Sequence, residues 1–393
     1  MKKRPSEFKD VKKILVIKLR HIGDVLLTVP VFRALKKAFP GAEISALINS
    51  GTEAVLHGNP LIDRIISFDR NIKGLPTLRR IAGEARFLNR LRSEDFDMTV
   101  DLTGGDRAAV ASFFSGARYR IGWKPDRGLA GKRFFYTHNV DPEGDKHMVL
   151  QNIGILEGSG IRAGDISVDF YTPAPEREGA ADMLNKNNMY SRSAIVHIHP
   201  TSRWLFKCWK DEYMAEMISW LIGNGAGVIL TSSPDRNEIE KAGRIISLVR
   251  SGGGKDDDGL LNLAGKTSIK QLGAISEAAD LFFGVDSAPM HIAAAVNTPV
   301  VALFGPSGAF NWGPWDNRYS VESTGHRAGQ AEPYSNKNGI QTFGMHTVIQ
   351  RSYDCVPCGR AGCDGSKKSR CLDDITPEEV KAVIEKKLKE IKK

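Results

Sequence analysis

The amino-acid sequence contains no long hydrophobic run among its 393 residues. Its longest apolar stretches are short segments such as Pro299 to Phe304, whereas a membrane helix needs ~18 or more consecutive apolar residues. The Lys-rich start does not continue as a signal peptide, because Lys18 and Arg20 closely follow the apolar run from Ile14 to Ile17. We therefore predict a cytoplasmic protein without a membrane-spanning segment.

Cysteine is scarce, with 5 residues, and the 39 glycines follow no G-X-Y period. With 41% hydrophobic and 26% charged residues, this composition excludes a disulfide-rich miniprotein, a collagen-like fibre and wholesale disorder. The length predicts two domains, because one domain usually takes ~100–200 residues.

Positive charge exceeds negative charge, and the excess is uneven. The chain has 55 basic and 46 acidic side chains, a net charge of +9, and the segment from Arg70 to Arg133 alone holds fourteen Lys/Arg against seven Asp/Glu. A local positive field favours an anionic partner such as phosphate, nucleic acid or an acidic membrane surface. A solvated basic face is the alternative, and the count does not choose between them.

The first half of the chain alternates strand patterns with helical patterns. The run from Lys13 to Leu19 predicts a buried strand, and the apolar spacing from Val25 to Phe39 predicts a helix. Strands separated by helices are typical of a parallel, doubly wound α/β sheet. Further strands are expected at Glu43 to Ile48, Arg64 to Phe68, Asp97 to Leu102 and Arg118 to Ile121.

A second alternating series follows an irregular segment, Gly158 to Glu178, which we interpret as the interdomain linker. The loop Ser251 to Asp258 is predicted to be a surface excursion. We expect an N-terminal domain at 1–175, a second domain at 176–350 and a cysteine-rich tail with a final helix at 351–393. The strands expected in the second series are Ser193 to His199, Gly227 to Thr231, Leu281 to Val285 and Pro299 to Phe304, and the helices are Asp211 to Ile222, Asp235 to Val249, Ser287 to Ala295 and Thr376 to Lys392.

The loop from Arg20 to Asp24 joins the first predicted strand to the first helix. Ligands gather at such turns in open α/β sheets. Gly23 permits a tight turn, and the carboxylate of Asp24 sits near a helix N-terminus. Asp24 is therefore either a helix cap or a functional carboxylate, and His21 is either a surface residue or a substrate contact.

Two segments in the second half also follow predicted strands. The turn from Asp286 to His291 opens a helix, and the N–H groups of a helix start can bind an anion. Alternatively, Asp286 or Ser287 only caps the helix, and His291 is a histidine packed in the core. The segment from Pro200 to Lys207 offers hydroxyls and an ammonium group, which suit a diphosphate, although a single lysine is often only a surface charge.

Two further patterns carry little weight. The run Gly265-Lys266-Thr267 resembles the end of a P-loop, but the glycine that this motif requires at position 260 is Leu260. We interpret Thr267 or Ser268 as a helix N-cap instead. The paired aspartates of Asp95 to Asp97 could suggest a metal site, but so short a pattern is common and here it lies just before a strand.

Four of the five cysteines, at positions 355, 358, 363 and 371, fall within seventeen residues. Their thiolates could complete a tetrahedral structural zinc site, although the spacing lacks the usual pair of C-x-x-C motifs. Disulfides or reduced thiols are the alternatives. The residues concerned are Cys355, Cys358, Cys363 and Cys371.

Three segments together resemble the bacterial heptosyltransferases of glycosyltransferase family 9, especially the heptosyltransferase III type of the lipopolysaccharide core. They are Lys13 to Pro30 (KILVIKLRHIGDVLLTVP), His199 to Trp209 (HPTSRWLFKCW) and Gly284 to Gly305 (GVDSAPMHIAAAVNTPVVALFG). The resemblance implies two facing Rossmann-like domains of the GT-B type with the active site in the cleft between them. It also implies a final helix that crosses back to the first domain.

The same resemblance implies an inverting transfer of heptose from ADP-heptose that needs no metal. Asp24 would be the general base and Lys207 would neutralise the diphosphate, with Arg20, His21 and Gly23 on the acceptor side. For the ribose, the resemblance leaves Asp235 and Glu238 open, and our prediction is Glu238. The other donor-binding residues implied are Thr201, Ser202, Asp286, Ser287, Ala288, Met290 and His291.

The implied partners are ADP-heptose, the lipid A-core oligosaccharide acceptor and the cytoplasmic face of the inner membrane, with no nucleic acid. Arg20 and His21 depart from the small residues that many family members have before the Gly-Asp pair, which leaves the acceptor's identity open. A transferase of the same fold with another donor or acceptor is one alternative. A non-catalytic nucleotide-binding or scaffold protein is another, and an ATP-dependent kinase or NTPase is disfavoured by the failed P-loop spacing.

Overall fold

The computed structural model describes residues 8–391 apart from 75, 127, 252–258 and 320–332. The chain folds into two compact units, with the division between Tyr171 and Thr172; Tyr319 belongs to the first unit. The described residues of 351–393 belong to the second unit. Most of the loop expected at Ser251 to Asp258 lies outside the described residues.

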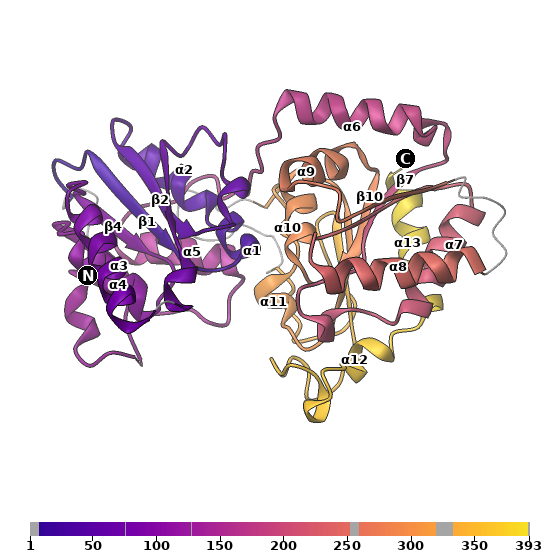
Figure 1. Ribbon diagram of the computed structural model, residues 1–393. Helices are drawn as coiled ribbons and strands as arrows, with labels where there is room; N and C mark the ends of the chain where they lie inside the picture. The colour runs from indigo at the N-terminus through magenta and orange to yellow at the C-terminus, as the bar shows by residue number, and fades with distance from the viewer. Residues whose placement is uncertain (1–7, 75, 127, 252–258, 320–332, 392–393) are drawn as a thin grey trace. The chain divides into compact units, whose positions relative to one another are not determined.

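The first unit is built on a six-stranded parallel sheet in the order β3-β2-β1-β4-β5-β6 (Figure 1). Strand β1 is buried between β2 and β4, which pair with it in parallel. The alternation of helices and strands predicted from the sequence is thus present. The strands are β1 (Lys13–Lys18), β2 (Glu43–Asn49), β3 (Arg64–Phe68), β4 (Met98–Asp101), β5 (Tyr119–Trp123) and β6 (His138–Val140), and the helices are α1 (Ile22–Leu26), α2 (Val29–Ala38), α3 (Thr77–Arg92), α4 (Asp106–Phe114) and α5 (Met148–Gly158).

The helix predicted from Val25 to Phe39 is two helices in the structure. Helix α1 ends at Leu26, and α2 begins at Val29 with Pro30 in its first turn. Proline has no N–H to donate, and its ring conflicts with the carbonyl four residues earlier, which here belongs to Leu26. The break leaves α1 as a short helix of five residues, which includes Asp24 and directly follows the loop after β1.

The second unit holds a seven-stranded sheet in the order β12-β13-β11-β10-β7-β8-β9, parallel except for β12. Strand β13 is fully buried and was not predicted. The strands are β7 (Ile195–His199), β8 (Gly227–Ser232), β9 (Leu260–Ala264), β10 (Leu281–Val285), β11 (Val300–Phe304), β12 (Gln341–Phe343) and β13 (His346–Gln350). The helices are α6 (Ala174–Lys186), α7 (Asp211–Gly223), α8 (Arg236–Ser251), α9 (Ile269–Ala278), α10 (Ala288–Ala295), α11 (Ala309–Trp312), α12 (Arg370–Asp373) and α13 (Pro377–Ile391).

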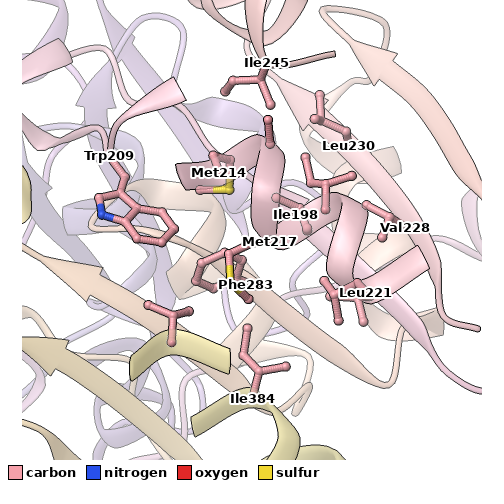
Figure 2. Packing of buried hydrophobic residues seen from close by; sticks show 14 of the residues in the cluster. Ile198, Trp209, Met214, Met217, Leu221, Val228, Leu230, Ile245, Phe283 and Ile384 are labelled. Carbon is pink, nitrogen blue, oxygen red and sulfur yellow. The ribbon is translucent and has the colours of Figure 1, made fainter. Parts of the chain in front are cut away.

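The core of the second unit includes the final helix. Figure 2 shows Ile384 of α13 near Phe283, and Trp209 and the fully buried Val380 belong to the same cluster. The indole N–H of Trp209 donates to the carbonyl of Ile375 at 3.0 Å, just before α13. The expectation that this helix crosses back to the first domain is therefore wrong, because its apolar face is buried in the second unit.

The expected linker from Gly158 to Glu178 is not a free connection. Helix α5 extends to Gly158 and α6 begins at Ala174. Between them, Ile161 and Val168 are almost completely buried. None of the described helices is long and apolar enough to cross a membrane.

Candidate functional site

In each unit, polar side chains gather where the strand order reverses. The chain passes from β7 to β8 on one side, and β10 later pairs with β7 on the other side. Loops at the carboxyl ends of β7 and β10 therefore diverge at this point, which is where open α/β sheets bind ligands. In the first unit, the corresponding point lies between β1 and β4.

Lys207 and Asp286 meet at the reversal point of the second unit. The ammonium nitrogen of Lys207, at the end of a short 3₁₀ helix, lies 2.6 Å from Oδ2 of Asp286, directly after β10. The Asp286 side chain is only 8% exposed and that of Lys207 is 22% exposed. The structure thus joins two candidate residues that are far apart in the sequence, with a positive charge held beside the start of α10.

The N-terminus of α10 carries a buried hydroxyl group. Ser287 is the N-cap residue but makes no side-chain cap hydrogen bond. Its buried hydroxyl has no hydrogen-bond partner among the described residues. A helix start with such a hydroxyl and a neighbouring ammonium group is suited to an anion.

The remaining candidates on α10 differ in exposure. Ala288 is partly exposed at the first helical position, and His291 is 5% exposed. Met290 is completely buried. Its donor-binding role stays a prediction, and with the thioether buried it would act through its backbone at the start of α10.

Thr201 and Glu238 also lie together, although they come from the segment after β7 and from α8. The Thr201 hydroxyl donates to Oε2 of Glu238 at 2.7 Å, and both residues are buried. Asp235 is exposed instead, and its carboxylate accepts the N–H of Asn237 in the first turn of α8. The geometry separates the two acidic candidates, because Glu238 faces a candidate site residue and Asp235 caps a helix. Ser202 is buried beside Thr201.

In the first unit, Asp24 lies in the first turn of α1 and is partly exposed. Its Oδ2 accepts the backbone N–H of His21 at 3.3 Å. Gly23 is buried, whereas Arg20 and His21 are exposed. Asp24 is thus a capping residue that solvent also reaches.

Sequence reasoning missed the loop after β4, which lies beside the Asp24 loop. The Thr103 hydroxyl accepts the N–H of Leu19 at 2.9 Å, and the Arg20 guanidinium donates to the Thr103 carbonyl at 3.4 Å. Gly104 has a φ of 70°, a left-handed conformation that favours glycine. The signal available in the sequence was a Gly-Gly pair directly after a predicted strand.

A buried carboxyl group holds that loop. Asp101 accepts the N–H groups of Thr103 and Gly104 and the hydroxyl of Tyr136, the last at 2.6 Å. Burial raises the pKa of Asp101, while these hydrogen bonds oppose the rise. Lys132 is also buried, and its ammonium group donates to the Gly104 carbonyl at 2.7 Å.

Lys18, the last residue of β1, carries a buried ammonium group near Asp24. It donates to the Leu102 carbonyl at 3.0 Å and to the Asn152 side chain at 3.2 Å. Burial lowers the pKa of Lys18 to about 8, and the charge of Asp24 opposes that lowering.

The four clustered cysteines have free thiols. Cys371 is buried and the other three are exposed. Burial raises the pKa of the Cys371 thiol to about 11, and the charges of Cys363, Cys358 and Cys355 add to the rise. Within the described residues, no three His, Cys, Asp or Glu side chains are arranged to hold a metal ion.

Comparison with known proteins places the chain in a family. Residues 84–338 match the model of glycosyltransferase family 9 (heptosyltransferase). The lipopolysaccharide heptosyltransferase 3 of Escherichia coli K12 is 33% identical over 305 residues, which cover 76% of this chain and 83% of that protein. The chain belongs to glycosyltransferase family 9. The resemblance found in its motifs is confirmed.

Solved structures of the family have the same fold. The glycosyltransferase family 9 protein of Veillonella parvula matches with a TM-score of 0.74 and 21% identity, covering 98% of this chain and 99% of that one. The E. coli heptosyltransferase WaaC with ADP-2-deoxy-2-fluoro heptose matches with a TM-score of 0.65 and 18% identity, covering 95% and 99%. The expected α/β fold with two Rossmann-like domains of the GT-B type is confirmed.

Proposed function

We propose that the protein transfers heptose from ADP-heptose to the inner core of lipopolysaccharide, with inversion and without a catalytic metal. The Lys207 ammonium group, which Asp286 holds at the start of α10, carries this proposal, because a diphosphate fits beside it and the helix N-terminus. The relative from E. coli is a lipopolysaccharide heptosyltransferase, and WaaC is known with a fluorinated ADP-heptose. Both support heptose as the transferred sugar.

The second unit holds the donor in this proposal. Lys207 and the N–H groups at the start of α10 bind the diphosphate, and the buried hydroxyl of Ser287 donates to it. The Glu238 carboxylate accepts the ribose hydroxyls. Asp286 holds Lys207 in place before the donor arrives. Thr201, Ser202, Ala288 and His291 complete the surroundings of the diphosphate.

The first unit supplies the base. The acceptor hydroxyl oxygen forms a bond to the anomeric carbon, while the bond from that carbon to the diphosphate oxygen breaks. Asp24 takes the hydroxyl proton, and Lys207 stabilises the charge that develops on departing ADP. One displacement on the face opposite the leaving group inverts the anomeric centre. Because Lys207 and the helix start supply positive charge, the step needs no metal ion.

The acceptor is bound by the loops after β1 and β4. Arg20 and His21 are exposed, and the guanidinium of Arg20 reaches the Thr103 carbonyl. Gly23 keeps the backbone close to the acceptor. The lipid A-core oligosaccharide carries phosphates, so the basic segment from Arg70 to Arg133 favours its approach.

The same segment contacts the cytoplasmic face of the inner membrane in this proposal. Phe114 and Phe134 are 49% and 67% exposed, in α4 and in the 3₁₀ helix that contacts it. The guanidinium of Arg133 lies 4.6 Å from the ring centre of Phe134. A pocket of about 380 Å³ between α3 and α4 includes Arg92 and Arg120 in its lining. Aromatic rings among arginines suit an anionic lipid surface.

The cysteine cluster is structural in this proposal and takes no part in transfer. Its four thiols lie in the second unit, before α13, and a single displacement needs no thiol. The proposal of a structural zinc ion rests on the spacing of the four cysteines, since no group of three or more possible ligands is arranged to hold a metal ion within the described residues. Zinc binding would draw the four thiols together and deprotonate them to thiolates.

Mass spectrometry of the lipopolysaccharide core from a strain lacking this protein tests the function. Loss of one heptose, restored by the wild-type gene and not by the gene encoding Asp24→Asn, supports the proposal. An unchanged core contradicts it. Loss of a different sugar would establish a transferase with another donor.

A further inference from the structure

A chain of buried polar side chains crosses the second unit beneath α9. His197 and His199 are two residues apart on β7 and therefore share a face of the sheet. Their neighbours on that face, Ile195 and Ile229, belong to an apolar cluster packed under α9. Both imidazole rings are almost completely buried. Burying a polar side chain in such a core costs free energy, because the group loses its contacts with water, unless it is fully hydrogen-bonded.

The contacts form one continuous series. Ser276 Oγ lies 2.9 Å from Nδ1 of His197, and Nε2 of His197 lies 2.8 Å from Oγ1 of Thr231. The same Thr231 oxygen lies 2.9 Å from Nδ1 of His199. Nε2 of His199 lies 3.4 Å from Oγ1 of Thr201, which donates to Glu238 at 2.7 Å.

The charge at one end fixes the direction of every bond. A carboxylate only accepts, so the Thr201 hydroxyl proton points at Glu238. His199 must then carry its proton on Nε2 and donate to Thr201. Its bare Nδ1 accepts from Thr231.

The far end of the chain follows the same rule. The Thr231 proton is already used, so His197 donates to Thr231 from Nε2 and accepts from Ser276 at Nδ1. This assignment of one proton to each hydrogen bond requires both imidazole rings to be neutral. Burial lowers the pKa of His197 and of His199 to about 3, which keeps both rings neutral at physiological pH.

We propose that this one-directional hydrogen-bond chain, acting through Thr201, positions Glu238 for the ribose of the donor nucleotide. The inference rests on the proposed function, because it takes Glu238 as the ribose ligand. The chain holds the Thr201 hydroxyl on Oε2 of Glu238 and thereby restrains the carboxylate. His197, His199, Thr231 and Ser276 are positioning residues and do not touch the donor.

Breaking the chain in the middle tests this role. Thr231→Val removes one hydroxyl and keeps the shape of the side chain. His199 is then free to move its proton to Nδ1, and the Thr201 hydroxyl is free to turn away from Glu238. We expect ADP to bind about tenfold more weakly and the KM for the donor to rise equally, with kcat within about twofold of wild type. Thr231→Ser restores the hydroxyl and should restore ADP affinity.

Thr298→Val is the matched control. Its hydroxyl is also buried and donates to the backbone carbonyl of Ser276 at 2.6 Å, a bond that does not involve the Ser276 hydroxyl of the chain. This variant should keep wild-type ADP affinity while losing comparable stability. Wild-type affinity in Thr231→Val, or equal weakening in Thr298→Val, overturns the positioning role.

NMR of the ¹⁵N-labelled wild-type protein tests the direction without any variant. We expect both His197 and His199 to carry their proton on Nε2. A proton on Nδ1 of either ring overturns the chain as described. Failure of the wild-type protein to bind ADP would contradict the proposed function instead, and the NMR result would still decide the direction.

Discussion

The ammonium group of Lys207 and the carboxylate of Asp286 form an ion pair of 2.6 Å between two loops of one sheet edge. The pair lies at the start of α10, next to the unpartnered hydroxyl of Ser287 in the described structure. Asp286 is almost buried, so its charge is compensated by Lys207. In the proposed function, a diphosphate arriving at this point would meet an ammonium group that is already held in place.

Removing the charge of Lys207 should slow transfer. We expect Lys207→Gln to reduce kcat by about 10²-fold, because the departing diphosphate loses one fixed positive group, and to weaken ADP binding. Steady-state kinetics and calorimetry measure the two effects. Lys381→Gln is the control, because Lys381 pairs with Glu216 and is 24% exposed, close to the exposure of Lys207. Equal activity of the two variants would remove Lys207 from the mechanism.

Asp24→Asn separates capping from catalysis. Asparagine caps a helix about as well as aspartate but does not accept a proton. We expect turnover to fall by ~10²–10⁴-fold with the melting temperature and ADP affinity nearly unchanged. Asp69→Asn serves as the control, because Asp69 accepts the N–H of Asn71 in the same unit. Near-normal turnover by Asp24→Asn, at a matched melting temperature, would leave Asp24 as a cap alone.

Metal removal should distinguish catalysis from structure. We expect ADP binding and turnover to continue unchanged in EDTA during a short assay, because Lys207 and the α10 start supply the positive charge. Elemental analysis of the purified protein should give about one zinc per chain.

The prediction for EDTA and the prediction for zinc can be contradicted independently of each other. Activity that vanishes in EDTA and returns with magnesium contradicts the metal-free step. Zinc-free protein with four reactive thiols contradicts the zinc site and leaves the transfer mechanism intact.

Lipid binding should depend on exposed aromatic rings of the first unit. We expect Phe114→Ser/Phe134→Ser to bind vesicles containing phosphatidylglycerol about tenfold more weakly than wild type, because partly inserted rings contribute apolar burial. Cosedimentation measures the effect. Tyr190→Ser/Ile340→Ser is the matched control, since these side chains are 54% and 55% exposed in the second unit. Equal loss in both double variants, or no binding by wild type, would refute this surface.

Lys18 gives the stability a defined pH dependence. Its pKa is about 8 in the folded protein, against 10.5 in the unfolded chain, so the unfolded state binds more protons between these values. Stability therefore rises with pH across this window. Relative to Lys18→Met, the wild-type free energy of unfolding should increase by about 3 kcal/mol from pH 7.5 to pH 10.5. Urea unfolding at several pH values measures it, and parallel curves for the two proteins would contradict it.

Much of the fold follows from local patterns. Strand β10 has the predicted bounds of Leu281 to Val285, because a short apolar run between polar residues has few alternatives in an α/β chain. Ser268 is the N-cap of α9, and its side chain accepts the N–H of Gln271, as the capping prediction required. Strand β13 escaped prediction, because its five residues mix polar and apolar side chains and are buried only by their neighbours.

Part of the candidate site could likewise be predicted from the sequence, and part of it could not. The positions of Asp24, Lys207 and Asp286 could be predicted from the ends of the expected strands, because ligand-binding loops follow parallel strands. The Lys207–Asp286 contact joins residues 79 positions apart and depends on β7 pairing with β10. The complete burial of Met290 could not be predicted for a related reason, since a motif does not tell which side of a helix faces the core.

Transfer by the purified protein tests the central claim most directly. The protein is incubated with ADP-heptose and a heptose-deficient lipopolysaccharide core, and the acceptor is analysed by mass spectrometry and NMR. We predict an acceptor that gains one heptose, with inverted anomeric configuration and one ADP released per sugar. An acceptor that gains no heptose in the presence of bound ADP-heptose, or gains it with retained configuration, would contradict the proposed transfer.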